Sequence, residues 1–254
     1  MRLNLGCGRA VHPDWVNVDL NASGPLAVKA DLRQPLPVAP NSSDCIYASH
    51  VLEHFPKRQA PRFLRECFLA LRPGGIIRLA VPDLEAMARL YLACLEGALS
   101  NDPQAAQRYD WILLEMFDQI VRTRSGGEMA AYWSQNPMPA EDFVLARTGG
   151  EVRGFLSNFR DKGMEHPNVR LLDEPKEDRE EYLRLRASGE LHLWMYDRFS
   201  LARLLAQAGF ERIEVKSFDS SGIPGFAAFG LDATQDGEAR KPDSLFLEGV
   251  KPRP

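Results

Sequence analysis

The first eight residues place the strongest constraint on the fold of this chain. The short apolar stretch Leu3-Asn4-Leu5 ends directly in Gly6-Cys7-Gly8, a pattern typical of a β-strand followed at once by a tight turn. Glycines at the end of a strand allow the backbone to approach a ligand closely, because they carry no Cβ atom. In open α/β sheets, ligands bind beyond the carboxyl ends of the strands. The N-terminal pattern therefore favours an α/β sheet with a binding site after its first strand.

Strand-like and helix-like stretches alternate over residues 1–83. Ile76–Val81 is a continuous aliphatic run, which is typical of a strand buried on both faces of a parallel sheet. The alternation predicts a parallel sheet with right-handed crossovers. Further strands are predicted at residues 16–19, 26–30 and 44–49, and a helix at 61–71.

The pattern changes after residue 83. Residues 84–191 are typical of helices interrupted by loops, with Arg124-Ser-Gly-Gly127 as a candidate hinge. Asp197 is a candidate N-cap of a helix that would stop at Gly209, and strands are predicted at 210–218 and 244–250. We expect one domain over residues 1–254, with 84–191 as a helical insertion.

Composition excludes several classes of protein. The chain has a net charge of −4 and a pI near 5.8, so it is not strongly basic as nucleic-acid-binding proteins often are. The four cysteines show no CxxC pair and no zinc spacing, so we expect buried free thiols and no metal. The N-terminus does not resemble a signal peptide, and no run of about 18 apolar residues is present. We therefore expect a cytoplasmic protein that does not bind a membrane.

Five short motifs occur in the order seen in class I S-adenosylmethionine (SAM)-dependent methyltransferases. They are Leu5-Gly-Cys-Gly8, Asn17-Val-Asp19, Asp31-Leu32, Ser49-His-Val-Leu-Glu-His54 and Leu71-Arg-Pro-Gly-Gly75. The chain resembles the members known as methyltransferase type 11, closely over residues 1–83 and more loosely over 192–251. The resemblance implies a Rossmann-like, mostly parallel seven-stranded sheet whose C-terminal strand is reversed.

The resemblance also implies a SAM site. Gly6 and Gly8 would border the methionine part of SAM, Asp19 would hold the ribose hydroxyls, and Asp31-Leu32 would flank the adenine. A loop or capping role for Asp31 is the alternative. The full set of candidate cofactor contacts is Asn4, Gly6, Cys7, Gly8, Asp19, Leu20, Asp31, Leu32 and Ser49.

Two features depart from the family pattern. Many relatives carry an acidic residue where this chain has Asn4, and Ala10 stands where a third small residue is common. In addition, only six residues separate Gly8 from Trp15, whereas a parallel crossover usually needs about a dozen or more. The first helix must therefore be reduced to about one turn. We expect residues 84–191 to cover the exposed flank of SAM; a dimer interface on the far side of the sheet is the alternative, so a homodimer is also considered.

Methyl transfer from SAM requires alignment of the reactants and sometimes a base. His50 would lie at the carboxyl end of the fourth strand, and His54 follows one helical turn later. Imidazole titrates near neutral pH, so either histidine could deprotonate a hydroxyl. Asp83, at the end of the fifth strand, is a third catalytic candidate. His54 could instead serve packing or capping, and Asp83 could cap the next helix.

The alternating residues His192, Trp194 and Tyr196 could share one face of an extended segment and bind a polar ring by stacking and hydrogen bonding. Packing of these side chains within the protein is the alternative. By analogy with similar short methyltransferases, the leading acceptor is a small-molecule hydroxyl, of a sugar or a secondary metabolite.

Two rival functions are considered. A non-catalytic SAM-binding scaffold would keep the fold without turnover. An NAD-dependent oxidoreductase would show G-x-G-x-x-G and an acidic residue about 20 residues on, but position 11 is Val11 and Asp19 comes 13 residues after Gly6.

Overall fold

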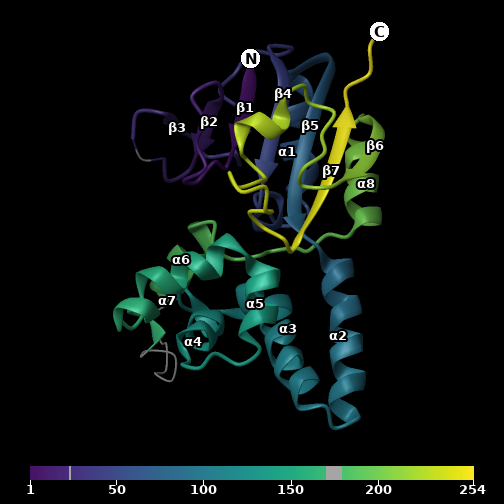
Figure 1. Ribbon diagram of the computed structural model, residues 1–254. Helices are drawn as coiled ribbons and strands as arrows, with labels where there is room; N and C mark the ends of the chain where they lie inside the picture. Colours follow the sequence, from purple (N-terminus) through teal and green to yellow (C-terminus); the bar gives the residue numbers. More distant parts are fainter. Residues whose placement is uncertain (23, 170–178) are drawn as a thin grey trace. The chain divides into compact units, whose positions relative to one another are not determined.

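The chain forms the predicted seven-stranded sheet, which lies in the first of two compact units. The computed structural model describes residues 1–22, 24–169 and 179–254. The first unit comprises residues 1–83, 193–239 and 244–254. Its strand order is β3-β2-β1-β4-β5-β7-β6 (Figure 1). The strands are β1 (Arg2–Leu5), β2 (Val16–Asp19), β3 (Ala27–Lys29), β4 (Ser43–Ser49), β5 (Leu71–Pro82), β6 (Glu211–Lys216) and β7 (Ser244–Val250).

Strand direction follows the expected pattern. Strands β1 to β5 pair in parallel, whereas β7 runs antiparallel to both β5 and β6. The predicted mostly parallel seven-stranded sheet with a reversed C-terminal strand is thus confirmed. Two consequences matter for the site. The order reverses between β1 and β4, and the start of β7 lies beside the end of β5, with Ser244 opposite Pro82.

One face of the sheet is covered by α1 (Ala60–Ala70) and α8 (Arg198–Gln207). Phe63, Leu64 and Cys67 of α1 and Leu201 and Leu205 of α8 pack into one buried cluster with alternate residues of the strands. Helix α8 begins at Asp197, whose carboxylate accepts hydrogen bonds from two backbone N–H groups in a capping box, as predicted from the sequence.

The opposite face is covered by the long connection between β6 and β7. Ile223, Phe226 and Leu231 from this connection pack on Trp15 and Tyr47. A short 3-10 helix, η4 (Phe226–Phe229), lies within it, in yellow-green across the strands in Figure 1.

A buried charged network holds the connection in place. The guanidinium of Arg78 on β5 donates to Asp232 over 2.7 Å and to Glu248 over 2.9 Å, and it also donates to the carbonyl oxygens of Ser217 and Ser220. Arg78 is fully buried. Buried charges are tolerated when they are paired and hydrogen-bonded, as they are here.

The second unit is helical and comprises residues 84–192 and 240–243. Its core gathers Trp111, Trp133, Val144, Val152 and Phe155. The loop at residues 124–127, expected to be a hinge, is held by Asp118 and Glu190, which accept from the backbone N–H groups of Glu128 and Gly126. The helices are α2 (Leu84–Leu99), α3 (Pro103–Val121), α4 (Gly127–Ser134), α5 (Glu141–Thr148), α6 (Gly150–Asn158), η2 (Arg160–Lys162) and α7 (Arg179–Ala187).

Candidate functional site

The candidate site lies at the carboxyl ends of β1 and β4, where the strand order reverses. Gly6, Cys7 and Gly8 follow β1, and His50 follows β4. In open α/β sheets the crevice for a ligand forms at this position, because the connections leave the two strands in opposite directions. The sheet therefore brings together the glycine turn and the histidine motif, two of the features singled out in the sequence.

The turn after β1 depends on glycine at two positions. Gly6 has a φ of +66°, and its backbone N–H donates to the carbonyl oxygen of Val18 over 2.7 Å. A Cβ atom at Gly6 would lie 2.2 Å from a methyl carbon of Val51, so no larger residue fits. Gly8 has a φ of +51°, but a Cβ atom there would have nothing within 4 Å. The turn therefore packs tightly against Val51 at Gly6, whereas the space beside Gly8 is open.

The connection from β1 to β2 is held by two buried amides instead of a helix. The amide nitrogen of Asn4 donates to the carbonyl oxygen of Ala10 over 2.7 Å and to Asn17 over 2.9 Å. Asn17 in turn donates to the carbonyl oxygens of His12, Trp15 and Leu26. Asn4 is thus placed behind the turn as a support. Asn17 was not predicted as a site residue, although it begins the Asn17-Val-Asp19 motif.

Asp19 ends β2 and is joined to the glycine turn. One carboxylate oxygen accepts from the backbone N–H of Gly8 over 2.8 Å, and the other accepts from the backbone N–H of Asn21 over 2.7 Å. An ionised carboxylate has about four lone-pair sites, so two remain for other donors. Leu20, also a candidate contact, follows in the next turn and is half-buried. This arrangement suits a carboxylate that binds the hydroxyls of a ribose.

Cys7 lies between the two glycines and is buried. Burial, together with the negative charge of Asp19, raises the pKa of the Cys7 thiol. The neutral thiol is a poor nucleophile. Cys7 is therefore suited to packing in the turn and not to covalent chemistry.

Asp31 and Leu32 follow β3. The side chain of Asp31 accepts from Nε of Arg33 over 2.8 Å and from its backbone N–H over 2.9 Å. These contacts hold the pKa of the Asp31 carboxyl below its usual range, and the hydrogen bond from the Arg33 side chain is the main cause. Leu32 packs against the main core. The carboxylate is thus ionised and fixed by its neighbour, and an adenine contact at Asp31-Leu32 stays a prediction.

The end of β4 carries a second group of polar side chains. Ser49 is the last residue of the strand, and His50 follows with a positive φ of +52°. The imidazole Nδ1 of His50 lies 3.3 Å from a carboxylate oxygen of Glu53, and its Nε2 lies 2.7 Å from the hydroxyl of Ser244. His50 was predicted from the sequence as a site residue, whereas neither of its two partners was. The three-residue spacing from His50 to Glu53 was a usable signal, whereas Ser244 lies 194 residues away.

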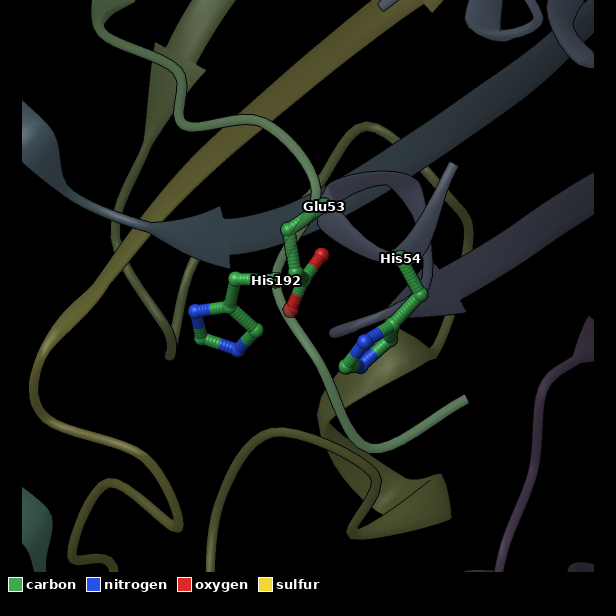
Figure 2. A group of neighbouring side chains, drawn as sticks. All are labelled: Glu53, His54 and His192. Carbon is green, nitrogen blue, oxygen red and sulfur yellow. The ribbon is translucent and has the colours of Figure 1, made fainter. Parts of the chain in front are cut away.

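Glu53 and His54 lie on the short 3-10 helix η1 (Leu52–His54), as Figure 2 shows. The Glu53 side chain is completely buried, and its backbone carbonyl accepts from the N–H groups of Leu193 and Trp194. His54 is half-buried and ends the helix. Figure 2 also labels His192, the residue that ends the 84–192 segment of the second unit, where its backbone N–H donates to the carbonyl oxygen of Gln119.

The remaining candidates lie in different surroundings. Trp194 is 39% exposed, and Nζ of Lys57 lies 4.1 Å from the centre of its ring. Tyr196 is buried in the main core, and its backbone pairs with that of Asp83 in an isolated bridge. Burial and the charge of Glu53 raise the pKa of the Tyr196 hydroxyl. Trp194 is thus partly exposed whereas Tyr196 is buried, and binding of a substrate by these residues stays a prediction.

Asp83 is half-buried and lies directly before α2. The expected roles of Asp83 in catalysis and of Trp194 in substrate binding stay predictions. Among the described residues, no helix is both long and apolar enough to cross a membrane.

A family model described as a methyltransferase domain matches residues 3–79. None of the curated proteins matches this chain in sequence.

Several solved structures are similar along nearly the whole chain. A SAM-dependent methyltransferase of Thermotoga maritima, described as a possible histamine N-methyltransferase, is 11% identical with a TM-score of 0.43, over 99% of this chain and 81% of its own. One from Archaeoglobus fulgidus is 13% identical with a TM-score of 0.43, over 98% and 85%. One from Mesorhizobium loti is 16% identical with a TM-score of 0.38, over 98% and 90%.

Proposed function

We propose that this chain, which belongs to the class I SAM-dependent methyltransferases, transfers the methyl group of SAM to a hydroxyl of a small molecule, such as a sugar or a secondary metabolite. The family match over residues 3–79 covers the glycine turn, Asp19 and the histidine motif. The hydroxyl acceptor rests on the chemistry at the end of β4, where an imidazole is paired with a buried carboxylate.

The observation that carries the cofactor site is the hydrogen bond between the N–H of Gly8 and the carboxylate of Asp19. It joins the open glycine turn, which lies at the strand-order reversal, to the carboxylate that ends β2, and this combination fits the methionine and ribose parts of SAM. In this proposal Gly6 and Gly8 border the methionine part, Asp19 holds the ribose and Asp31-Leu32 flanks the adenine. When bound, SAM supplies a methyl group on an already activated sulfonium.

His50 is the proposed base. Its Nδ1 faces Glu53, and an ionised carboxylate only accepts hydrogen bonds, so the ring proton belongs on Nδ1. Nε2 then carries a lone pair and can accept a proton. Glu53 is fully buried and would stabilise the imidazolium that forms. A base of this kind suits an acceptor that must lose a proton as it is methylated, as a hydroxyl does.

Calorimetry with S-adenosylhomocysteine and a transfer assay with labelled SAM test the proposal. We expect saturable binding of S-adenosylhomocysteine, and label transfer to at least one member of a panel of methyl glycosides and phenols. Binding without transfer to any of these, or to a cell extract, would favour a non-catalytic SAM-binding scaffold. A thermal shift with NAD and none with S-adenosylhomocysteine would instead indicate an oxidoreductase.

Variants of the histidines then test the base. His50→Ala should lower turnover by about 10²- to 10⁴-fold, which is typical of the loss of a general base, with little change in S-adenosylhomocysteine affinity. His54→Ala tests the neighbouring candidate. His166→Ala is the control, because His166 stacks on Phe155 within the second unit. Unchanged turnover in His50→Ala would exclude it as the base.

A further inference from the structure

Ser244 lies at the same edge of the sheet as His50, although 194 residues separate them. Strand β7 is reversed, so its first residue lies beside the carboxyl end of β5, opposite Pro82. The backbone N–H of His50 donates to the carbonyl oxygen of Ala80 on β5 over 2.8 Å. Sheet pairing on both sides therefore fixes the two residues that form the 2.7 Å contact between Oγ of Ser244 and Nε2 of His50.

Glu53 determines which atom of this contact donates. The Glu53 carboxylate lies 3.3 Å from Nδ1 of His50, and its negative charge would repel a lone pair on that atom. The ring proton therefore belongs on Nδ1, so Nε2 is the acceptor and the hydroxyl of Ser244 is the donor. The order of groups is then carboxylate, imidazole and hydroxyl, with the imidazole 3.3 Å from the carboxylate and hydrogen-bonded to the hydroxyl. In enzymes with this order, the hydroxyl is the group that gives up its proton to the imidazole.

We propose that Ser244 relays the proton of the acceptor hydroxyl to His50, with Glu53 as a positioning residue; this inference rests on the proposed function. A relay is needed because Nε2 of His50, the atom that would take the proton, already accepts a hydrogen bond from Ser244 over 2.7 Å. The histidine side chain is only 12% exposed. An acceptor therefore meets a base whose reactive atom is covered by the serine hydroxyl.

The transfer balances without a further reactant. The acceptor hydroxyl gives its proton to Oγ of Ser244, while the proton of Ser244 passes to Nε2 of His50. The acceptor oxygen forms the new bond to the methyl carbon, and the carbon–sulfur bond breaks with its electron pair left on sulfur. The imidazolium of His50, beside the carboxylate of Glu53, afterwards returns its proton to water.

Nitrogen NMR of the histidine rings tests the arrangement without an acceptor. In the full-length protein with S-adenosylhomocysteine, neutral His50 should carry its proton on Nδ1, and Ser244→Ala should change the Nε2 shift while Nδ1 stays protonated. Glu53→Gln should lose the preference for Nδ1–H. A neutral ring protonated on Nε2 in the wild type, or an Nε2 shift that ignores Ser244→Ala, would overturn the proposal.

Turnover of the acceptor found in the transfer assay tests the relay itself. Ser244→Ala should lower kcat about 10²-fold or more with KM changed far less, and Ser244→Thr, which keeps a hydroxyl, should restore most of it. Ser42→Ala is the control, because the Ser42 hydroxyl donates to the carbonyl oxygen of Ala39 before β4 begins. A wild-type kcat in Ser244→Ala would show that His50 needs no relay.

The two proposals fail in different ways. If S-adenosylhomocysteine does not bind, or no hydroxyl compound accepts label, the proposed function is wrong, whatever the ring protonation of His50. If binding and transfer are normal but Ser244→Ala and Glu53→Gln change neither the NMR signals nor kcat, only the relay is wrong.

Discussion

The backbone N–H of Gly8 donates to the carboxylate of Asp19 over 2.8 Å, which links the turn after the first strand to the end of the second. The connection between these strands is too short for a helix, so this bond and the amides of Asn4 and Asn17 determine its path. The residue proposed to hold the ribose therefore also shapes the turn proposed to hold the methionine part.

Asp19→Ala should weaken the binding of S-adenosylhomocysteine while the protein stays folded. Loss of two hydrogen bonds to a charged acceptor implies roughly 2–4 kcal/mol in binding free energy, since each contributes about 1.5–3 kcal/mol and such terms are not additive. Calorimetry measures the affinity, and circular dichroism checks the fold. Asp19→Asn keeps one acceptor oxygen and should give an intermediate loss. Wild-type affinity in a folded Asp19→Ala protein would show that the ribose binds elsewhere.

Alanine at Gly6 should mainly lower the stability of the protein, whereas alanine at Gly8 should mainly weaken ligand binding. Gly6→Ala should reduce stability strongly, because its Cβ atom would lie 2.2 Å from Val51 in addition to the strain of a positive φ. Gly8→Ala should reduce stability by only about 1–2 kcal/mol, the strain alone, but should weaken S-adenosylhomocysteine binding because the new methyl group enters the open side of the turn.

Urea unfolding and calorimetry on the two variants separate these effects. Val51→Ala in the Gly6→Ala background should recover part of the lost stability, since it removes the methyl group that collides. Equal loss of stability in Gly6→Ala and Gly8→Ala would contradict the steric argument.

Much of the sheet could be predicted from local sequence patterns. Ile76–Val81 lies within β5, and the predicted strand at 244–250 coincides with β7. These elements were recognisable because a buried strand is a continuous apolar run between turn residues. The cover formed by the β6–β7 connection could not be predicted. Its contacts join Phe226 and Ile223 to Trp15 and Tyr47, about 200 residues away along the chain, and loops carry no periodic pattern.

The candidate site shows the same division. Gly6, Gly8 and Asp19 were predicted because short motifs at strand ends carry their own signal. Ser244 was missed because its contact with His50 depends on sheet register between distant strands. The proposal that residues 84–191 cover the cofactor stays a prediction. Limited proteolysis tests this prediction: S-adenosylhomocysteine should protect the chain from cleavage near residues 122–124.

Arg78→Met should destabilise the protein by roughly 3–5 kcal/mol, because it leaves Asp232 and Glu248 buried without their shared cation. Urea unfolding measures the loss. Arg72→Met is the matched control. Arg72 pairs with Asp44 on the surface, where 61% of its side chain is exposed, and such pairs contribute about 0–1 kcal/mol. A loss below about 1 kcal/mol in Arg78→Met would mean that the connection between β6 and β7 is held mainly by apolar packing.

The Asp243 carboxyl makes stability depend on pH within the second unit. Burial, together with the nearby charge of Glu115, raises the pKa of Asp243 from 3.8 to about 7. Between these two values the unfolded chain has lost the proton that the folded chain keeps. The free energy of unfolding therefore falls as the pH rises from about 4 to 7, and the contribution of Asp243 is constant above that window.

Asp243→Asn should remove this fall, because an amide stays neutral at every pH in the range. The variant should match the wild type at about pH 4 and below, and exceed its stability at pH 8 by up to about 4 kcal/mol, since each pKa unit corresponds to about 1.36 kcal/mol. Urea unfolding of both proteins at several pH values measures the difference between their free energies of unfolding. Groups that titrate equally in the two proteins do not contribute to this difference. Asp236→Asn, at an exposed position, should show no such trend. A stability difference between Asp243→Asn and wild type that stays constant from pH 5 to pH 8 would show that Asp243 is already ionised at the lower pH.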